Sequence, residues 1–252
     1  MLETIKILRD KKHRTLEFVF TREEETTTAG AVNFDYSLLE AKQGYCFDSV
    51  SPIGTIILAS PFYERFDLKI IGKAAHASKP QEAINVLSVF KDILNEFPLG
   101  KLDNDTVINI GKVSGGHVRN TIPGELVLHG EIRSFVEQIM NTHKKRLEDV
   151  VKKICDNYGA TYKLEFVREN PGYKLLSIMQ IIKNTAQAME KCGIIPQPLE
   201  AWGVSDANIF NNKGLTCVNL GDGVEYPHTV HERIKISDME KLVKLMVQLV
   251  KI

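Results

Sequence analysis

Three consecutive glutamates, Glu23, Glu24 and Glu25, are the first residues in the chain whose types and spacing point to chemistry. They follow a short apolar run, residues 18–20, that is typical of the end of a strand, and they precede a turn of threonines and small residues. The carboxyl end of a strand is where an α/β protein builds a metal site from oxygen ligands. A run of like charges is also common on a solvated surface, so the cluster alone leaves both interpretations open.

Hydrophobic patterning places these glutamates in a region of mixed helices and strands. Helical spacing is found at residues 2–12 and, more briefly, at 32–43, and apolar strand patterns are found at 15–20, 44–50 and 54–61. The C-terminal part has the same mixture of helix and strand patterns. It has helical patterns at 175–193 and 236–252, a loop at 202–210 and an apolar strand at 216–221.

The middle of the chain has a different and more regular pattern. Strand-like alternation and 3.6-residue periodicity predict the order strand, helix, strand, strand, helix, strand, over residues 64–76, 81–97, 106–116, 125–135, 137–159 and 161–170. This order is typical of an α+β module with helices on one face of an antiparallel sheet. We therefore expect an α/β domain, residues 1–62 and 170–252, that is interrupted by an inserted two-layer domain at 63–169.

Composition excludes several classes of function. The 252 residues are 43% hydrophobic and 25% charged, as in ordinary globular proteins, and 32 basic residues balance 32 acidic ones. Without a net positive charge, neither nucleic acid nor an anionic membrane is an expected partner. The four cysteines are scattered and have no close Cys or His neighbours, which disfavours a thiolate zinc site and fits reduced thiols. No signal-peptide pattern opens the sequence, so a cytoplasmic location is predicted.

Seven motifs, taken together and in order, resemble the dinuclear-zinc superfamily of aminopeptidases, carboxypeptidases and amino-acylases that includes carboxypeptidase G, with peptidase T-like proteins the most similar. The motifs are FTREEETTTAGA, GYCFDS, GKAAHASKPQEAIN, GGHVRNTIPG, GEIRS, GVSDANIF and VNLGDGVEYPHTVHE. The resemblance implies that 1–62 and 170–252 form a zinc-exopeptidase catalytic domain. It also implies that 63–169 is a dimerisation or lid domain and that the protein is a homodimer.

The resemblance assigns roles around a zinc site. Glu25, Asp48 and His228 match metal ligands, and Glu24 matches the general base that activates the attacking water. Glutamate, aspartate and histidine are suitable zinc donors. A separate base is needed because a carboxylate bound to zinc cannot also carry protons. Outside this context, Asp48 would be read as a turn residue and His228 as a surface residue.

Further residues match substrate-handling positions. His76 resembles the histidine that polarises the scissile carbonyl, usually in the site of the partner subunit. Asn120 and Arg133 resemble residues that hold the substrate, since a guanidinium suits a terminal carboxylate, although Arg133 could equally form a salt bridge on the sheet surface. Ser205 lies in a loop that lines the family's pocket, together with Gly203 and Asp206. Thr27 and Thr28 stand where the family usually has glycines, and β-branched residues resist a positive φ.

Part of the family's ligand set has no counterpart. A ligand histidine in an H-x-D motif and a bridging aspartate are expected. None of the seven histidines has an aspartate two residues later. We therefore expect the early strands of the catalytic domain to be missing, zinc occupancy to be partial or nil, and this chain alone to be nearly inactive. Three interpretations stay open: a truncated zinc peptidase, one half of a split enzyme, or a non-catalytic relative that dimerises or binds a ligand.

The family reaction would be hydrolysis of a small peptide, as in a tripeptidase, or of an N-acyl amino acid. Only the likeness of the C-terminal motifs favours a peptidase over a deacylase, and this is an argument by analogy between related folds.

Overall fold

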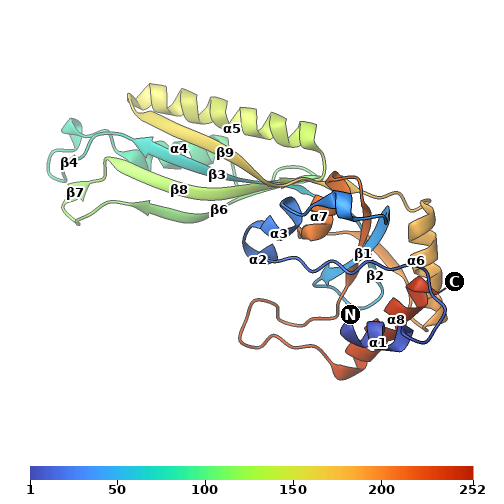
Figure 1. The fold of residues 1–252 in the computed structure, drawn as a ribbon. Helices are drawn as coiled ribbons and strands as arrows, with labels where there is room; N and C mark the ends of the chain where they lie inside the picture. Colours follow the sequence, from blue (N-terminus) through green and yellow to red (C-terminus); the bar gives the residue numbers. More distant parts are fainter. Residues whose placement is uncertain (252) are drawn as a thin grey trace. The chain divides into compact units, whose positions relative to one another are not determined.

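The computed structural model describes residues 1–251, with the backbone alone for Thr27, and it divides into two compact units (Figure 1). Unit 1 is formed by Met1–Ser60 and Tyr173–Ile252, and unit 2 by Pro61–Gly172. Each unit has its own hydrophobic core, and no core cluster of the described residues draws members from both. Among these residues, no helix has the length and apolarity needed to cross a membrane.

Unit 1 is built on a mixed five-stranded sheet. The central path runs in the order β1 (Gln43–Ser49), β12 (Thr216–Gly221), β2 (Thr55–Ser60) and β10 (Tyr173–Lys174), and β11 (Gln197–Glu200) also pairs with β2. The β1–β12 and β11–β2 pairs are parallel, whereas β12 and β10 run antiparallel to β2. Strand β1 therefore stands at one end of the sheet, with its carboxyl end beside that of β12.

Helices cover both faces of this sheet. They are α1 (Leu2–Leu8), α2 (Glu24–Thr27), α3 (Ala29–Val32), the 3₁₀ helix η1 (Tyr36–Leu38), α6 (Gln180–Lys191), α7 (Asp206–Asn212) and α8 (Ile236–Val250). The apolar sides of α6 and α8 bury Ile181 and Leu245 in one cluster with Val218 of β12. The next residue of β12 toward its start, Cys217, belongs to a second cluster with Phe210 of α7. This alternation is the period-2 pattern of a strand covered on both faces.

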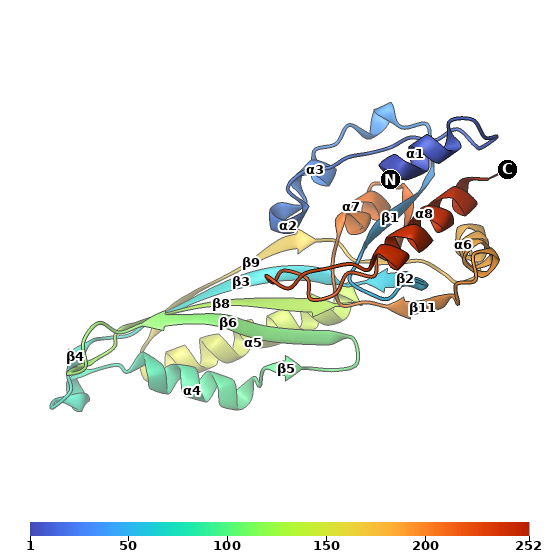
Figure 2. The same ribbon diagram turned by 90° about the horizontal axis from the view of Figure 1, so that it is seen from below.

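Unit 2 is an antiparallel sheet with two helices on one face (Figure 2). The strand order is β5 (Gly100–Lys101), β6 (Thr106–Gly115), β8 (Glu125–Ser134), β3 (Phe62–Ile71) and β9 (Thr161–Asn170). Helices α4 (Val86–Glu96) and α5 (Glu137–Tyr158) bury their apolar sides against β3 and β8. Short strands β4 (Ala75–His76) and β7 (Thr121–Ile122) pair separately, and the 3₁₀ helix η2 spans Pro80–Glu82.

The structure confirms the mixed α/β class, the inserted α+β module and its six predicted elements. Two predictions in unit 1 are wrong. Residues 15–20 are extended but join no ladder among residues 1–251, because β1 does not pair with them. The helix predicted over 32–43 is reduced to η1, and the Glu17 carboxylate instead accepts the backbone N–H groups of Glu40 and Ala41 at 3.0 and 2.8 Å. Local apolar pattern cannot by itself create a strand when no neighbouring strand is available.

Candidate functional site

Helix α2 presents the last two glutamates of the acidic cluster. Its first residues are Glu24 and Glu25, and the preceding Glu23 is the N-cap in the left-handed region at φ 57°. Acidic side chains are favoured in the first turn of a helix because the backbone N–H groups there carry no intrahelical partner. Neighbouring positions of one turn point in different directions, so the two carboxylates occupy different surroundings.

Glu24 is the half-buried member of the pair. Burial, followed by repulsion from Asp48, Glu25 and Asp206, raises the pKa of Glu24 from 4.5 to about 7. A carboxyl group with a pKa near neutrality can hold or release a proton under physiological conditions, as a general base must. Glu25, by contrast, is solvent-facing, with 73% of its side chain exposed.

Asp48 comes to the same place from the end of β1. Its backbone N–H donates to Asn219 Oδ1 at 3.1 Å, and Asn219 Nδ2 donates back to the Asp48 carbonyl at 3.0 Å. Asn219 lies on the neighbouring strand β12, is 5% exposed, and also donates to Ser205 Oγ. Loss of water contact, followed by repulsion from Asp222, Glu25 and Asp206, raises the pKa of Asp48, while His228 opposes the shift.

His228 reaches the cluster from the loop between β12 and α8. Its Nδ1 lies 3.6 Å from Glu25 Oε2, and both side chains are largely exposed. The backbone of His228 is left-handed, at φ 59°, and its N–H donates to Glu232 Oε2 at 2.8 Å. The structure thus brings Glu24, Glu25, Asp48 and His228 together, although they are up to about two hundred residues apart in sequence.

Backbone strain gathers around this cluster. Within residues 1–251, the non-glycine residues with positive φ are Glu23, Thr28, Tyr226 and His228. All four belong to the two segments that carry Glu24, Glu25 and His228. Thr28 stands where the family usually has a glycine, and its backbone is left-handed at φ 49°, a conformation that β-branched residues resist. Strained backbone of this kind is enriched at functional sites.

The residues present fit part of a metal site. Zinc bonds of 2.0–2.2 Å in tetrahedral geometry hold two ligand atoms about 3.4 Å apart, which is close to the Glu25–His228 distance. However, nowhere in residues 1–251 do three or more His, Cys, Asp or Glu side chains form a group that could hold a metal ion. Glu25 and His228 are therefore suited to two positions of a coordination shell, and the remaining positions are not supplied by the described residues.

Two further residues shape the site. The sequence analysis assigned no role to Asn219 and expected Asp206 only to lie in the loop that lines the pocket. Asn219, in VNLGDG, is the link that holds the end of β1 to β12. Asp206, the first residue of α7, is 4% exposed, and its Oδ1 has no hydrogen-bond partner among the described residues. Burial raises the pKa of Asp206, and a hydrogen bond from Thr21 opposes this. A polar residue inside an apolar strand, as in VNLG, is the signal that could have drawn attention to Asn219.

Ser205 serves as the N-cap of α7. Its Oγ accepts from the Ala207 N–H at 3.2 Å and from Asn219, and the residue is 2% exposed. These contacts are those of a capping residue in the interior. Substrate contact by Ser205 stays a prediction.

The remaining predicted residues lie in unit 2. His76, in β4, is exposed, and its Nδ1 accepts the backbone N–H of Ser78 at 3.2 Å. Ser78 Oγ also lies 2.8 Å from Nδ1, and a neutral ring that accepts at Nδ1 carries its proton on Nε2, which can then act as a donor. Asn120 is exposed in the turn before β7, where its carbonyl accepts the Ala77 N–H.

Arg133, in β8, forms a salt bridge on the sheet, which is the alternative to substrate binding that the sequence analysis considered. It donates through two nitrogens to both carboxylate oxygens of Glu131, at 3.1 and 3.2 Å, and its guanidinium stacks 4.5 Å from the ring centre of Tyr63. A role for Arg133 in holding a substrate stays a prediction.

Comparison with known proteins places this arrangement in a family. The M20 peptidase dimerisation domain matches residues 64–159. The uncharacterised protein YqjE of Bacillus subtilis is 30% identical over 253 residues, which cover 99% of this chain and 68% of YqjE. Peptidase T of Escherichia coli K12 is 25% identical, and the chain spans only 62% of its length.

A solved structure agrees with this over the whole chain. A tripeptidase from Staphylococcus aureus, SAV1512, matches with a TM-score of 0.96 and 29% identity, over 99% of this chain and 68% of that one. The inserted domain, the collinear motifs and the match across both units lead to one conclusion. The chain belongs to the M20 family of peptidases, among its peptidase T-like members.

Proposed function

We propose that this chain carries the general base, a share of the metal ligands and the dimerisation domain of a metal-dependent exopeptidase. The substrate class would be small peptides, tripeptides in particular. The observation that carries the proposal is the meeting of Glu24, Glu25, Asp48 and His228 at the carboxyl end of β1. Nothing in a purely structural module requires a carboxylate with a pKa of about 7 beside a glutamate–histidine pair.

Each side chain has a distinct role in this proposal. Glu25 and His228 would hold one metal ion, and Asp48 would contribute to a second; zinc is the metal that the resemblance implies. A bound metal of this kind activates water and polarises a carbonyl. Glu24 takes the proton from the attacking water and passes it to the leaving amine, because it lies beside Glu25 yet is not itself a ligand.

Unit 2 has the supporting role. We infer that it forms the interface of a homodimer, and that the Nε2–H of His76 donates to the oxygen on which negative charge develops. The hydrogen bond from the Ser78 N–H to Nδ1 supports this, since a neutral ring that accepts at Nδ1 carries its proton on Nε2. We also infer a cytoplasmic location.

The reaction is tested by joining this chain to the part of the staphylococcal tripeptidase that lies outside the match. We expect the fusion to hydrolyse a tripeptide, and Glu24→Gln to lower kcat by 10²–10⁴-fold, the usual contribution of a general base. Glu23→Gln, one residue earlier and equally acidic, is the control and should leave the rate within about twofold. A fusion that binds zinc but cleaves no tripeptide with wild-type Glu24 would contradict the proposal.

For the chain alone we expect sub-stoichiometric zinc and no measurable hydrolysis, since the described residues supply no complete ligand group. Elemental analysis that finds a full pair of zinc ions, together with tripeptide cleavage, would overturn this expectation. An N-acyl amino acid deacylase of the same superfamily is distinguished by assaying an N-acetyl amino acid in parallel. A non-catalytic, dimerising relative is the conclusion if neither substrate is cleaved by the fusion.

A further inference from the structure

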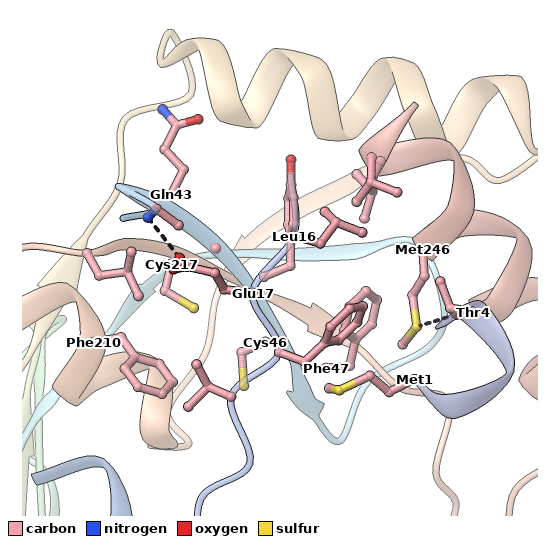
Figure 3. Close-up of a pocket in the computed structure, with 18 of the residues that line it drawn as sticks. Met1, Thr4, Leu16, Glu17, Gln43, Cys46, Phe47, Phe210, Cys217 and Met246 are labelled. Atoms are coloured by element: carbon pink, nitrogen blue, oxygen red, sulfur yellow. Dashed lines mark hydrogen bonds between the residues drawn. The ribbon is translucent and has the colours of Figure 1, made fainter. Parts of the chain in front are cut away.

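His228 has little packing around it, although its position decides whether it can share a metal ion with Glu25. Its side chain is 69% exposed, and its Nδ1 lies 3.6 Å from Glu25 Oε2. A cavity of about 830 Å³ lies beside the site (Figure 3). Glu24 and Glu25 contribute to its wall, but none of residues 222–235, all of which the structure describes, does so. The placement of the imidazole therefore depends on the structure of its own loop.

A short antiparallel bridge joins the two ends of this loop. The Glu225 N–H donates to the Arg233 carbonyl at 2.8 Å, and the Arg233 N–H donates to the Glu225 carbonyl at 3.1 Å. The Glu225 carboxylate also accepts from Lys235 Nζ and Arg233 Nε, each at 2.8 Å, and these bonds hold the pKa of Glu225 below its ordinary value. Residues 226–232 thus form a loop with fixed ends.

Inside the loop, side chains supply hydrogen bonds that a helix or a strand would take from the backbone. Thr229 Oγ1 donates to the Tyr226 carbonyl at 2.8 Å and accepts the His231 N–H at 3.2 Å. The Glu232 N–H donates to the Thr229 carbonyl at 3.1 Å, which turns the chain back on itself. The turn brings the Glu232 carboxylate to the His228 N–H, which donates to Oε2 at 2.8 Å.

The bond to Glu232 acts on the backbone group that sets the conformation of His228. His228 is left-handed at φ 59°, which is uncommon for a residue other than glycine. A glutamate or glutamine at the third position of a helix holds the N-cap N–H in the same way, in the capping box. A hydrogen bond to an ionised acceptor is also stronger than one between neutral groups. The bond to Glu232 therefore stabilises the unusual turn at His228.

Repulsion alone would direct the Glu232 side chain elsewhere. Burial raises the pKa of Asp222, backbone N–H groups oppose this shift, and the charge of Glu232 adds to it. Two like charges at short range favour separation, and an exposed glutamate on a loop is free to turn into solvent. A specific donor, the His228 N–H, explains why the carboxylate stays.

We propose that Glu232 is a positioning residue, which fixes the left-handed backbone of His228 through its N–H and so directs the imidazole toward Glu25 for metal binding. Glu232 does not itself take a coordination position. The inference rests on the proposed function in one respect, the assignment of His228 as a metal ligand. The placement of His228 by Glu232 does not depend on that assignment.

The first measurement is made on the metal-free chain. Glu232→Ala should speed the exchange of the His228 amide with water, followed by NMR, by about fivefold or more. Glu232→Gln should restore the protection, because an amide oxygen can accept the same hydrogen. Glu225→Ala should speed exchange across residues 225–233, which distinguishes general loosening of the loop from loss of the single bond.

The second measurement is a calorimetric titration with zinc alone. The difference between the wild type and His228→Ala defines the share of the affinity that depends on His228. Glu232→Ala should lose most of this share, whereas Glu232→Gln should keep it. Glu240→Ala removes another exposed charge, from α8, and as the matched control it should change neither zinc affinity nor the exchange of the His228 amide.

Two results would overturn the proposal. One is an unchanged His228 amide in Glu232→Ala. The other is a loss of zinc affinity in Glu232→Gln as large as in Glu232→Ala, because Glu232 then acts through its charge or as a ligand. If the zinc affinity of the wild type does not depend on His228, the proposed metal site fails, and the amide exchange by itself decides whether Glu232 places His228.

Discussion

At the scale of single residues, the site is defined by carboxylates that share a small space. Burial and the charges of Asp48, Glu25 and Asp206 keep Glu24 protonated up to about pH 7. Asp48 and Asp206 also have raised pKa values, for the same leading reason of lost water contact. In the metal-free chain these groups oppose folding whenever they ionise, which links stability to pH.

Glu24→Gln should therefore stabilise the metal-free chain at pH 8 and leave it unchanged at pH 4. The native state binds the Glu24 proton more tightly than the unfolded state does, so stability is lost as pH rises from 4.5 to about 7. Removing the charge recovers roughly 1–2 kcal/mol after allowance for solvent screening. Thermal melts in EDTA measure this, with Glu23→Gln as control. Equal gains at both pH values would show that the pKa of Glu24 is not raised.

The left-handed backbone at Glu23 gives a second residue-scale prediction. A left-handed conformation costs an L-residue about 1–2 kcal/mol, whereas glycine adopts it freely but loses about 0.5–1 kcal/mol of chain entropy. Glu23→Gly should thus be more stable than Glu23→Ala by about 0.5–1 kcal/mol, and both variants lack the charge. At Glu190, in the regular helix α6, the order should reverse. Urea unfolding of the four variants measures their free energies of unfolding. If the glycine and alanine variants rank in the same order of stability at both positions, the prediction is wrong.

At the scale of elements, the central strands of unit 2 depend on a glycine. Gly130 in β8 is the register partner of Phe66 in β3, and an added Cβ would lie 2.3 Å from Phe66 Cζ and 2.5 Å from the Asn109 carbonyl oxygen. The ring of Phe66 therefore lies directly over the glycine, and it also contacts the ring of Phe166 at 5.8 Å between centroids. This explains on physical grounds why the GEIRS motif begins with glycine.

Gly130→Ala should destabilise unit 2 by about 1–3 kcal/mol, the usual cost of overpacking. Gly111→Ala, in the adjacent strand β6, is the matched control. Its Cβ would meet only the Asn109 side chain, at 3.8 Å, so the gain of about 0.5–1 kcal/mol expected from replacing glycine in a strand should appear. Chemical unfolding of both variants measures the difference, and a neutral Gly130→Ala would mean that Phe66 can move aside.

The elements also show what sequence can and cannot predict. Unit 2 follows its hydrophobic pattern because β3, β8 and the two helices share one buried face. Residues 15–20 carry an equally good strand pattern but lack a partner, since strand formation depends on a neighbour as well as on local residue types. The convergence of Glu25 and His228 could be expected only from the motifs, and the bracing of Asp48 by Asn219 arises from strands far apart in sequence.

At the scale of the whole molecule, the two units share no buried cluster of the described residues, which implies two folding units. The core of unit 2 is composed of residues between Phe66 and Ala160, and those of unit 1 come from outside that range. Residues 61–172 should consequently fold when expressed alone, because their sheet and both helices are complete.

The isolated 61–172 segment should show a cooperative thermal transition and sediment as a dimer, since it contains the matched dimerisation domain. Ile132→Ala, at a site with 0% exposure in β8, should lower its free energy of unfolding by about 2–5 kcal/mol. Val167→Ala, at a 41% exposed site in β9, is the control and should have a small effect. A segment that folds but stays monomeric at high concentration would contradict the dimer and leave the fold prediction intact.

The pairing of β2 with β10 has a consequence for how such proteins diversify. Ser60, where the chain leaves unit 1, is the direct register partner of Tyr173, where it returns. The host sheet therefore closes across the junction with its own backbone ladder, and a tight hairpin could replace all of residues 61–172 without stretching either strand. Recombination at this junction can exchange, lengthen or delete the insert as one unit, so relatives are free to vary the insert while retaining the same host sheet.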